Sequence, residues 1–353
     1  MFTKILSIAT EVPKIKITQL EVINTIKKIF SKKYLQKFEK MIPIYKNSGV
    51  KQRFGCVPMD WHFKYRGWKE RNSTFIKNAT QLVENAIVKC LEKKSIKIKD
   101  IDAIVSVSST GIATPTIDAL IVEKFSMSRY IKRLPIFGLG CAGGVLGLAR
   151  AADLAKSMPG KKVLFFDVEV CSVNFQSNDF SKKNIIASAL FGDGAAAAVL
   201  STEGEGINIE NTAEYTWKSS LDIMGWEIID SGLGVIFSKN IPKLIKKDFR
   251  KITNTFLKNN NLELKNIKEF IPHPGGAKVL DALEEVYDLK NGKLNHSRQI
   301  LKNYGNMSSA TVLFILERAI DKFDNKKKGR YLMTALGPGF TSGFMNLKIN
   351  NKI

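Results

Sequence analysis

The segment LPIFGLGCAGGVLGLARAADLAKSM, residues 134–158, holds the strongest structural signal in the chain. An apolar strand runs into a glycine-rich turn, and small and apolar side chains then follow in the pattern of a buried helix. Cys141 is therefore expected at the first turn of that helix, where amide groups stabilise an anion and favour the thiolate. The surrounding glycines leave room for a carbonyl group to approach the sulfur. The alternative is that Cys141 is a small buried hydrophobic residue.

The alternation of strand and helix extends to both sides of this segment and predicts an α/β protein. Further strand-like runs are expected at 101–109, 163–170, 195–201, 226–232, 269–276 and 331–339. The composition turns polar and glycine-rich around residues 202–206. A boundary near 205 therefore divides the chain into halves at 1–205 and 206–353.

The composition is that of a folded protein with a strong positive charge. The 353 residues are 44% hydrophobic and 25% charged, which excludes a disordered or collagen-like protein. Lys and Arg total 55 against 33 Asp and Glu, a net charge of +22, so anionic partners are expected. The basic residues are scattered, and no helix-turn-helix, zinc-finger or RRM signature is present, which argues against nucleic acid and favours a phosphate-bearing small molecule. The run Lys326-Lys327-Lys328 is expected to be a solvated loop.

Cysteine usage indicates a reducing, cytoplasmic setting. The four cysteines, at 56, 90, 141 and 171, form no C-x-x-C pair, and residues 1–17 lack the long apolar run of a signal peptide. The longest apolar stretch, at 185–200, is interrupted by Gly192-Asp193-Gly194 and is too short to cross a bilayer. No membrane-spanning segment is predicted.

One of the three histidines is well placed for acid–base chemistry. His273 ends an apolar strand and is followed by a turn at Gly275-Gly276, which suits a general acid or base. His62 and His296 lie among polar or charged residues and are expected to be surface side chains.

A third candidate completes the catalytic set. Asn306, in the segment YGNMSS, precedes a helical run and could simply cap it. Together with Cys141 and His273, however, it gives a Cys/His/Asn trio. A papain-type protease has the same inventory, but its C-G-x-C-W setting near the N-terminus is absent here.

A competing interpretation concerns nicotinamide cofactors. Gly138, Gly140 and Gly143 match G-x-G-x-x-G, and Asp167 ends the next strand where a ribose-binding acid belongs. This match follows an earlier strand–helix unit instead of opening the fold, and it places a thiol where pyrophosphate should lie. An NAD(P)-dependent dehydrogenase is therefore a distant alternative, which saturable NAD(P)H binding would support.

Several motifs together resemble the type III polyketide synthases, the chalcone synthase-like family of the thiolase superfamily. They occur in family order across nearly the whole chain, at 140–144, 189–195, 273–276, 304–309 and 336–339. The stretches 108–115 and 224–226 are more like the bacterial branch that makes alkylpyrones and alkylresorcinols. A β-ketoacyl-acyl-carrier-protein synthase III shares the trio but usually continues its histidine as His-Gln-Ala-Asn, where this chain has His-Pro-Gly-Gly.

The resemblance implies a five-layered αβαβα thiolase fold built from two similar halves, working as a homodimer. It implies that Cys141 carries the acyl group and that His273 and Asn306 polarise thioester carbonyls. Acyl-CoA and malonyl-CoA would be the substrates, and the chemistry requires no metal or redox cofactor. His273 could hold Cys141 as a thiolate–imidazolium pair, and the intact trio argues against a catalytically silent binding protein.

The resemblance also implies positions around the substrate. Phe175 lies near the family's gatekeeping phenylalanine, with core packing as the alternative, and the second gatekeeper has no clear match beside Trp226. The glycine-rich loop is matched by Gly337, Pro338 and Gly339. The basic residues at the tunnel mouth are matched by Lys37, Lys40 and, across a small insertion, Lys46; each could also be a solvated lysine. Ser109, Ala113 and Thr114 are small residues where a medium-to-long aliphatic starter would need room, while starter length, number of extensions and ring closure are not determined by these motifs.

Overall fold

The computed structural model describes residues 2–30, 32–238, 240–289, 292–321 and 328–350. Lys326 and Lys327 of the expected loop lie outside these ranges. Within them, the main sheet has the strand order β11-β12-β13-β8-β1-β7-β6-β4-β5. No helix of the described part is both long and apolar enough to span a membrane.

The first half of the chain supplies one end of this strand order. Its strands are β1 (Thr3–Glu11), β4 (Ile101–Val107), β5 (Lys132–Ile136), β6 (Lys162–Val170) and β7 (Asp193–Ser201). Its α-helices are α1 (Gln19–Ile29), α2 (Lys32–Glu39), α3 (Ile42–Lys46), α4 (Trp68–Glu92), α5 (Ile117–Lys124), α6 (Gly143–Ser157) and α7 (Lys182–Leu190). A separate antiparallel pair joins β2 (Ile15–Thr18) to β3 (Gln52–Gly55).

The second half supplies the other end. Its strands in the main sheet are β8 (Ile207–Thr216), β11 (Ile267–Pro272), β12 (Gly329–Gly337) and β13 (Thr341–Ile349), and β9 (Met224–Ile229) pairs with β10 (Gly232–Phe237) separately. Its α-helices are α8 (Ile241–Leu244), α9 (Arg250–Asn259), α10 (Ala277–Val286), α11 (Asn295–Tyr304) and α12 (Thr311–Asp321). The chain passes from one half to the other between β7 and β8, at residues 202–206.

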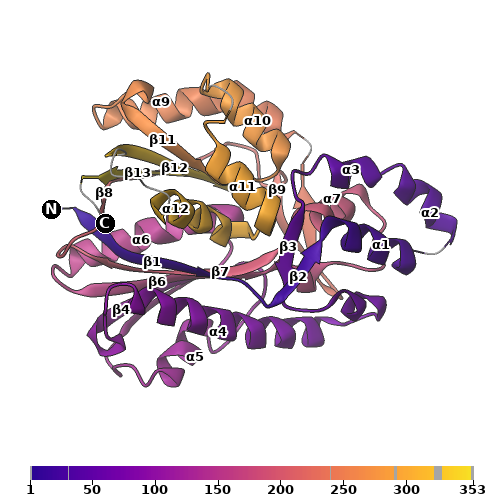
Figure 1. Cartoon of the computed structure of the whole chain (residues 1–353), viewed down its shortest axis with the longest axis horizontal. Coiled ribbons are helices and arrows are strands. Elements are labelled where there is room, and N and C mark those ends of the chain that lie inside the picture. Colours follow the sequence, from indigo (N-terminus) through magenta and orange to yellow (C-terminus); the bar gives the residue numbers. More distant parts are fainter. Residues whose placement is uncertain (1, 31, 239, 290–291, 322–327, 351–353) are drawn as a thin grey trace.

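The elements stack in five layers, as expected for a thiolase fold (Figure 1). Helices α9 and α10 lie on one outer face, with β11, β12 and β13 beneath them, and α6 and α12 form the middle layer. Strands β1, β6 and β7 follow, covered on the far side by α4 and α5. The two sheet regions are linked where β1 pairs with β8 over Thr3–Ile5 and Ile207–Ile209.

Small residues allow this close stacking. A Cβ atom on Gly147 of α6 would lie 2.4 Å from Val107 Cγ2 on β4, and one on Gly343 of β13 would lie 2.9 Å from Leu146 Cδ2. Helix α6 is therefore clamped between two sheet regions, and a larger side chain at either glycine would push them apart.

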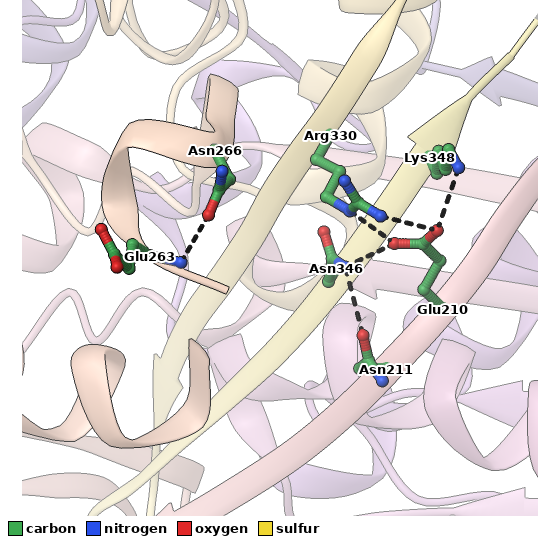
Figure 2. A network of polar contacts seen from close by, with 7 residues as sticks. All are labelled: Glu210, Asn211, Glu263, Asn266, Arg330, Asn346 and Lys348. Atoms are coloured by element: carbon green, nitrogen blue, oxygen red, sulfur yellow. Dashed lines mark hydrogen bonds and ion pairs between the residues drawn. The ribbon is translucent and has the colours of Figure 1, made fainter. Parts of the chain in front are cut away.

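A polar cluster ties β8 to β12 and β13 (Figure 2). Glu210 accepts a 2.8 Å hydrogen bond from Arg330 and one of 2.9 Å from Asn346, and its second oxygen lies 3.8 Å from Lys348 Nζ. Asn346 also donates to Asn211 at 3.2 Å. The cluster joins three neighbouring strands through side chains as well as through their backbones.

Candidate active site

Cys141 lies in a short 3₁₀ turn, η3 (Gly140–Ala142), which leads directly into α6. Its side chain is buried. Gly140 has a φ of +46°, and a Cβ atom there would lie 2.5 Å from Pro338 Cδ. The Gly140 amide donates a 3.1 Å hydrogen bond to Ser109 Oγ. The turn thus requires glycine and is held on opposite sides by the 338 loop and by Ser109, so the predicted placement of Cys141 at a helix start is confirmed.

Burial shifts the pKa values of both Cys141 and His273 towards their neutral forms. Burial raises the pKa of its thiol to about 12, with smaller contributions in the same direction from Glu169 and Asp167. Burial lowers the pKa of His273 to about 3. Neither ring nitrogen of His273 has a hydrogen-bond partner among the described residues, and the Cys141 sulfur lies 3.7 Å from Ser308 Oγ. Desolvation opposes the effect of the helix N-terminus and favours the neutral thiol and the neutral imidazole, so the thiolate–imidazolium pair stays a prediction.

His273 reaches this region through the C-terminal ends of two parallel strands. It follows β11 directly, and its backbone N–H donates a 2.8 Å hydrogen bond to the Thr334 carbonyl of β12. Strand β12 continues to Gly337, where a Cβ atom would lie 2.4 Å from the Leu139 carbonyl oxygen and 2.7 Å from Ala142 Cβ. Strand β12, which accepts the hydrogen bond from His273, therefore packs on the turn that carries Cys141.

Asn306 both caps a turn and keeps a free amide. Its Oδ1 accepts a 2.9 Å hydrogen bond from the Ser308 amide, at the start of the 3₁₀ turn η7 (Ser308–Ala310). Its Nδ2 is buried without a partner in the described part of the chain. Asn306 is not the N-cap of this turn, which is Met307, but its bond to the Ser308 amide fixes the side chain so that the amide N–H groups stay available. Ser308 links Asn306 to Cys141, a connection that the sequence did not reveal.

An aromatic residue not singled out from the sequence adjoins Asn306. Phe191 forms a parallel bridge with Asn306, and the Gly192 amide donates a 3.0 Å hydrogen bond to the Asn306 carbonyl. The Phe191 ring centroid lies 6.3 Å from that of Trp226. The sequence signal for Phe191 is the 189–195 motif, in which it directly precedes Gly192.

Phe175 and Trp226 line the same cavity as Phe191. The cavity is mostly apolar and is bounded on its other side by α1, through Val22, Thr25, Ile26 and Ile29. Phe175 packs edge-on against His62, with ring centroids 5.5 Å apart. The structure thus brings the two sequence-predicted aromatic residues together with Phe191 around one space.

The expectation that His62 is a surface residue is wrong. It is 7% exposed, and its ring packs against Trp61 with centroids 5.1 Å apart. Burial, with Arg71 and Arg66 nearby, lowers its pKa to about 3. The polar neighbours in sequence were misleading because the short helix η1 (Met59–Phe63) turns this one side chain inward. His296 is half-buried.

Two positions proposed for the tunnel occupy different environments. Ser109 is buried and belongs to the support of the Cys141 turn, whereas Thr114 is exposed. Ala113 packs into the hydrophobic core beneath α4. None of the three lines the cavity beside α1.

The dinucleotide interpretation is not supported. A Cβ atom on Gly143 would lie 2.7 Å from Val107 Cγ1 and 3.1 Å from Ser309 Cβ, so this glycine serves packing between protein segments. Asp167 is fully buried and hydrogen-bonded to Ser309 at 2.6 Å. It cannot reach a ribose hydroxyl.

Comparison with known proteins decides the family. The N-terminal domain of chalcone and stilbene synthases matches residues 2–204, and the C-terminal domain matches residues 192–349. The chain belongs to the chalcone and stilbene synthase family. It is thus a type III polyketide synthase, an acyltransferase that condenses malonyl-CoA by decarboxylation and uses CoA thioesters without a separate cofactor.

Individual relatives agree with this assignment. The chain is 35% identical to a Bacillus subtilis protein named "Putative chalcone synthase", over 96% of each chain. It is 32% identical to 1,3,6,8-tetrahydroxynaphthalene synthase of Streptomyces peucetius, over 86% of this chain and 82% of that one. The crystal structure of the Streptomyces coelicolor tetrahydroxynaphthalene synthase superposes with a TM-score of 0.93 at 25% identity, over 99% of both chains.

A surface groove of this type III polyketide synthase lies beside the strand end that carries His273. It has a volume of about 530 Å³ and runs between Asn47-Ser48 and the 275–279 segment. Lys182, Lys183 and Lys278 line it. The predicted lysines are exposed: Lys37 lies on α2, Lys40 in the turn after it and Lys46 at the end of α3. None of the three lines the groove, although Lys46 adjoins the lining residue Asn47.

Proposed function

We propose that this type III polyketide synthase loads an aliphatic acyl-CoA starter onto Cys141, extends it with malonyl-CoA and cyclises the product to an alkylpyrone or alkylresorcinol. The observation that favours an aliphatic starter is the apolar lining of the cavity between the aromatic residues and α1, whose volume of about 70 Å³ must widen to hold a long chain. Each methylene buried in such a space contributes about 0.8 kcal/mol. Because the wall at Phe191 adjoins Asn306, an acyl chain held at Cys141 has an apolar space close to its reacting end.

Loading begins from the neutral pair. As the Cys141 sulfur attacks the thioester carbon, His273 accepts the thiol proton, the S–C bond forms and coenzyme A leaves as a thiolate. The proton on the imidazolium can then pass to that thiolate. A buried neutral imidazole suits this role because it is a free base at neutral pH.

Extension uses the same donors on an enolate. The C–C bond to the malonyl carboxylate breaks, CO₂ leaves, and the electron pair goes to the thioester oxygen. The unpaired Nδ2 group of Asn306 and an N–H of His273 donate to that oxygen. The enolate carbon then attacks the acyl carbon on Cys141, and the sulfur leaves. Phe191, bridged to Asn306, keeps this space apolar, which favours loss of a charged carboxylate as neutral CO₂.

Coenzyme A is assigned to the groove beside residues 275–279. Its phosphates carry negative charge, and Lys182, Lys183 and Lys278 supply positive charge there. Alanine at Lys278 should raise KM for malonyl-CoA by roughly two- to fivefold, with a smaller effect at high salt. Alanine at Lys37 is the matched control, and an equal rise in KM for that variant would move the phosphate site to α2.

The starter is tested by comparing kcat/KM for hexanoyl-, dodecanoyl-, palmitoyl- and p-coumaroyl-CoA, with malonyl-CoA alone as a further reaction and the products weighed by mass spectrometry. Ala187→Leu narrows the cavity and should shift the optimum to shorter chains. Thr114→Leu changes an exposed side chain and should leave the optimum in place. A flat chain-length profile, or formation of 1,3,6,8-tetrahydroxynaphthalene, the compound in the relatives' names, contradicts the proposal.

A second copy of the chain is proposed to cover the edge strand β5. Within the described part of the chain, this strand is paired only on its β4 side. Leu134 of the strand is 40% exposed, and Phe137 just after it is 56% exposed. An open strand edge with apolar side chains is a surface that proteins cover. Light scattering should give twice the monomer mass, and Phe137→Lys should lower it; an unchanged dimer would place the interface elsewhere.

A further inference from the structure

Two buried carboxyl groups behind Cys141 share one hydroxyl group. Ser309 Oγ lies 2.6 Å from Asp167 Oδ1 and 2.6 Å from Glu169 Oε1. All three side chains are completely buried. The two acids are two residues apart on β6 and therefore face the same side of the sheet.

This geometry requires a proton. A serine hydroxyl has one hydrogen, so it can donate to only one of two carboxylates. If both acids were ionised, the other contact would set two negatively polarised oxygens against each other at hydrogen-bond distance. One acid must therefore carry a proton and donate it to Ser309 Oγ, which in turn donates to the other acid.

The hydrogen-bond inventory shows which acid holds the proton. Glu169 Oε2 accepts bonds of 2.7 Å from Thr110 Oγ1 and 3.0 Å from the Ser109 amide. The Thr110 hydroxyl oxygen itself accepts from the Val170 amide, so its hydrogen is directed at Glu169. Asp167 Oδ2 has no partner in the described part of the chain. Glu169 therefore has the hydrogen-bond donors that stabilise an ionised carboxylate, and Asp167 is the acid that keeps the proton.

We propose that Asp167 is a neutral carboxylic acid that positions Ser309 and Glu169, so that a single negative charge is kept behind Cys141, and that loss of the Asp167 proton limits the enzyme at alkaline pH. The last clause rests on the proposed function of Cys141. A second negative charge at Asp167 would oppose both the Cys141 thiolate and the malonyl carboxylate.

Among the described residues, the surroundings contain no countercharge for a second carboxylate. On the neighbouring strands, Asp167 faces Val107 of β4 and Ala196 of β7, and α6 presents glycines to Ser309. The titratable groups that interact with the two acids are the thiols of Cys141 and Cys171, which are neutral or negative. Burial and Glu169 both raise the pKa of Asp167.

Infrared spectroscopy of protein labelled with carboxyl-¹³C aspartate tests the proton directly, without any need for activity. Wild type should show the C=O band of a neutral acid at neutral pH, and Asp167→Asn should lack it. Asp193→Asn is the matched control, because Asp193 is equally buried but accepts hydrogen bonds from the Ser172 and Cys56 amides. Absence of the band in wild type, or its persistence in Asp167→Asn, overturns the proposal.

The pH profile tests the consequence. Asp167→Asn, which replaces the O–H donor with an N–H donor, should keep kcat for malonyl-CoA decarboxylation within about threefold at neutral pH and shift the alkaline fall to higher pH. Asp167→Ala, which removes the donor, should lower kcat by about tenfold. In wild type the acid band should disappear over the pH range in which activity falls. An unshifted alkaline fall in Asp167→Asn refutes the proposed limit even where the band is present, and an inactive wild type refutes the proposed function instead.

Discussion

Two polar clusters of this molecule differ in how far their hydrogen-bonding groups are paired: the cluster around Glu210, and the trio of Cys141, His273 and Asn306. At Glu210, a carboxylate meets Arg330, Asn346 and Lys348, and one side-chain atom of the cluster, Asn346 Oδ1, has no partner among the described residues (Figure 2). At the proposed catalytic trio, both ring nitrogens of His273 and the amide nitrogen of Asn306 are buried and have no partner in the part of the chain that the structure describes.

The difference separates a stabilising cluster from a reactive one. An unsatisfied buried polar group costs about 1–3 kcal/mol. The trio leaves three such nitrogens where a substrate oxygen can pair with them, so part of the binding free energy is realised only when an oxyanion is present. Substitutions at the two clusters should therefore affect activity and stability in opposite proportions.

The largest expected effect is at Cys141. Cys141→Ala should abolish the acyl-enzyme while the fold is kept, because a small side chain fits the glycine-rich turn. Intact-protein mass spectrometry after mixing with an acyl-CoA measures the adduct. An adduct on the alanine variant, or a wild-type adduct that maps to Cys56, Cys90 or Cys171, would contradict the assignment.

Removal of the unpaired donors should follow in size. His273→Ala and Asn306→Ala should each lower malonyl-CoA decarboxylation by about 10²–10³, the usual cost of one oxyanion donor. His273→Ala should also slow acylation, since it removes the base, whereas Asn306→Ala should spare that step. Rapid-quench measurement of both steps separates the two roles, and equal losses of acylation would show that the division is wrong.

The alkylation rate of Cys141 should rise with pH. Because burial raises the thiol pKa to about 12, the thiolate fraction increases about tenfold for each pH unit throughout the neutral and mildly alkaline range. The rate of iodoacetamide modification at Cys141, followed by peptide mass spectrometry, should show no plateau below pH 10. A plateau near neutral pH would instead reveal a preformed thiolate–imidazolium pair.

The smallest effect is expected at the paired cluster. Glu210→Ala leaves Arg330 without its partner and should lower the free energy of unfolding by about 1–2 kcal/mol, while kcat changes little. Urea unfolding measures this value. His273→Leu is the contrasting variant, which should unfold at the same or a higher urea concentration despite its loss of activity. A large decrease in the free energy of unfolding for His273→Leu, together with none for Glu210→Ala, would contradict this contrast between the two clusters.

The sequence predicted part of the alternation of strands and helices, but the largely apolar strands β1, β10 and β13 were not among the expected strands. The runs at 101–109 and 163–170 became β4 and β6. Strand β8 was not among the expected strands, because its outer part, NIENTAEYT, is rich in Asn and Glu. Strand β8 lies between β1 and β13, and its Glu210 is paired with Arg330. The polar side chains of β8 are therefore tolerated in the sheet because of strand neighbours and an ion pair that are distant in the chain.

The site divides in the same way. The residue types and glycine settings single out Cys141, His273 and Asn306 as candidates from local sequence, and their roles stay a prediction. The cavity beside α1 and the shared hydroxyl of Ser309 arise from segments that meet only in the fold. The complete burial that raises the pKa of Cys141 is likewise a property of the whole molecule, which local sequence does not contain.

The bridge between Phe191 and Asn306 affects when the site can form during translation. The Asn306 amide donates a 2.8 Å hydrogen bond to the Leu190 carbonyl, so this corner of the site is made of backbone from both halves of the chain. On the ribosome, the Cys141 half is synthesised first and waits for a segment that emerges near the end of translation. The residues that pack on the Cys141 turn, Gly337 and Pro338, emerge later still, so neither the nucleophile nor the oxyanion donors are in place until translation is almost complete. Acyl transfer therefore becomes possible only once the protein is nearly complete.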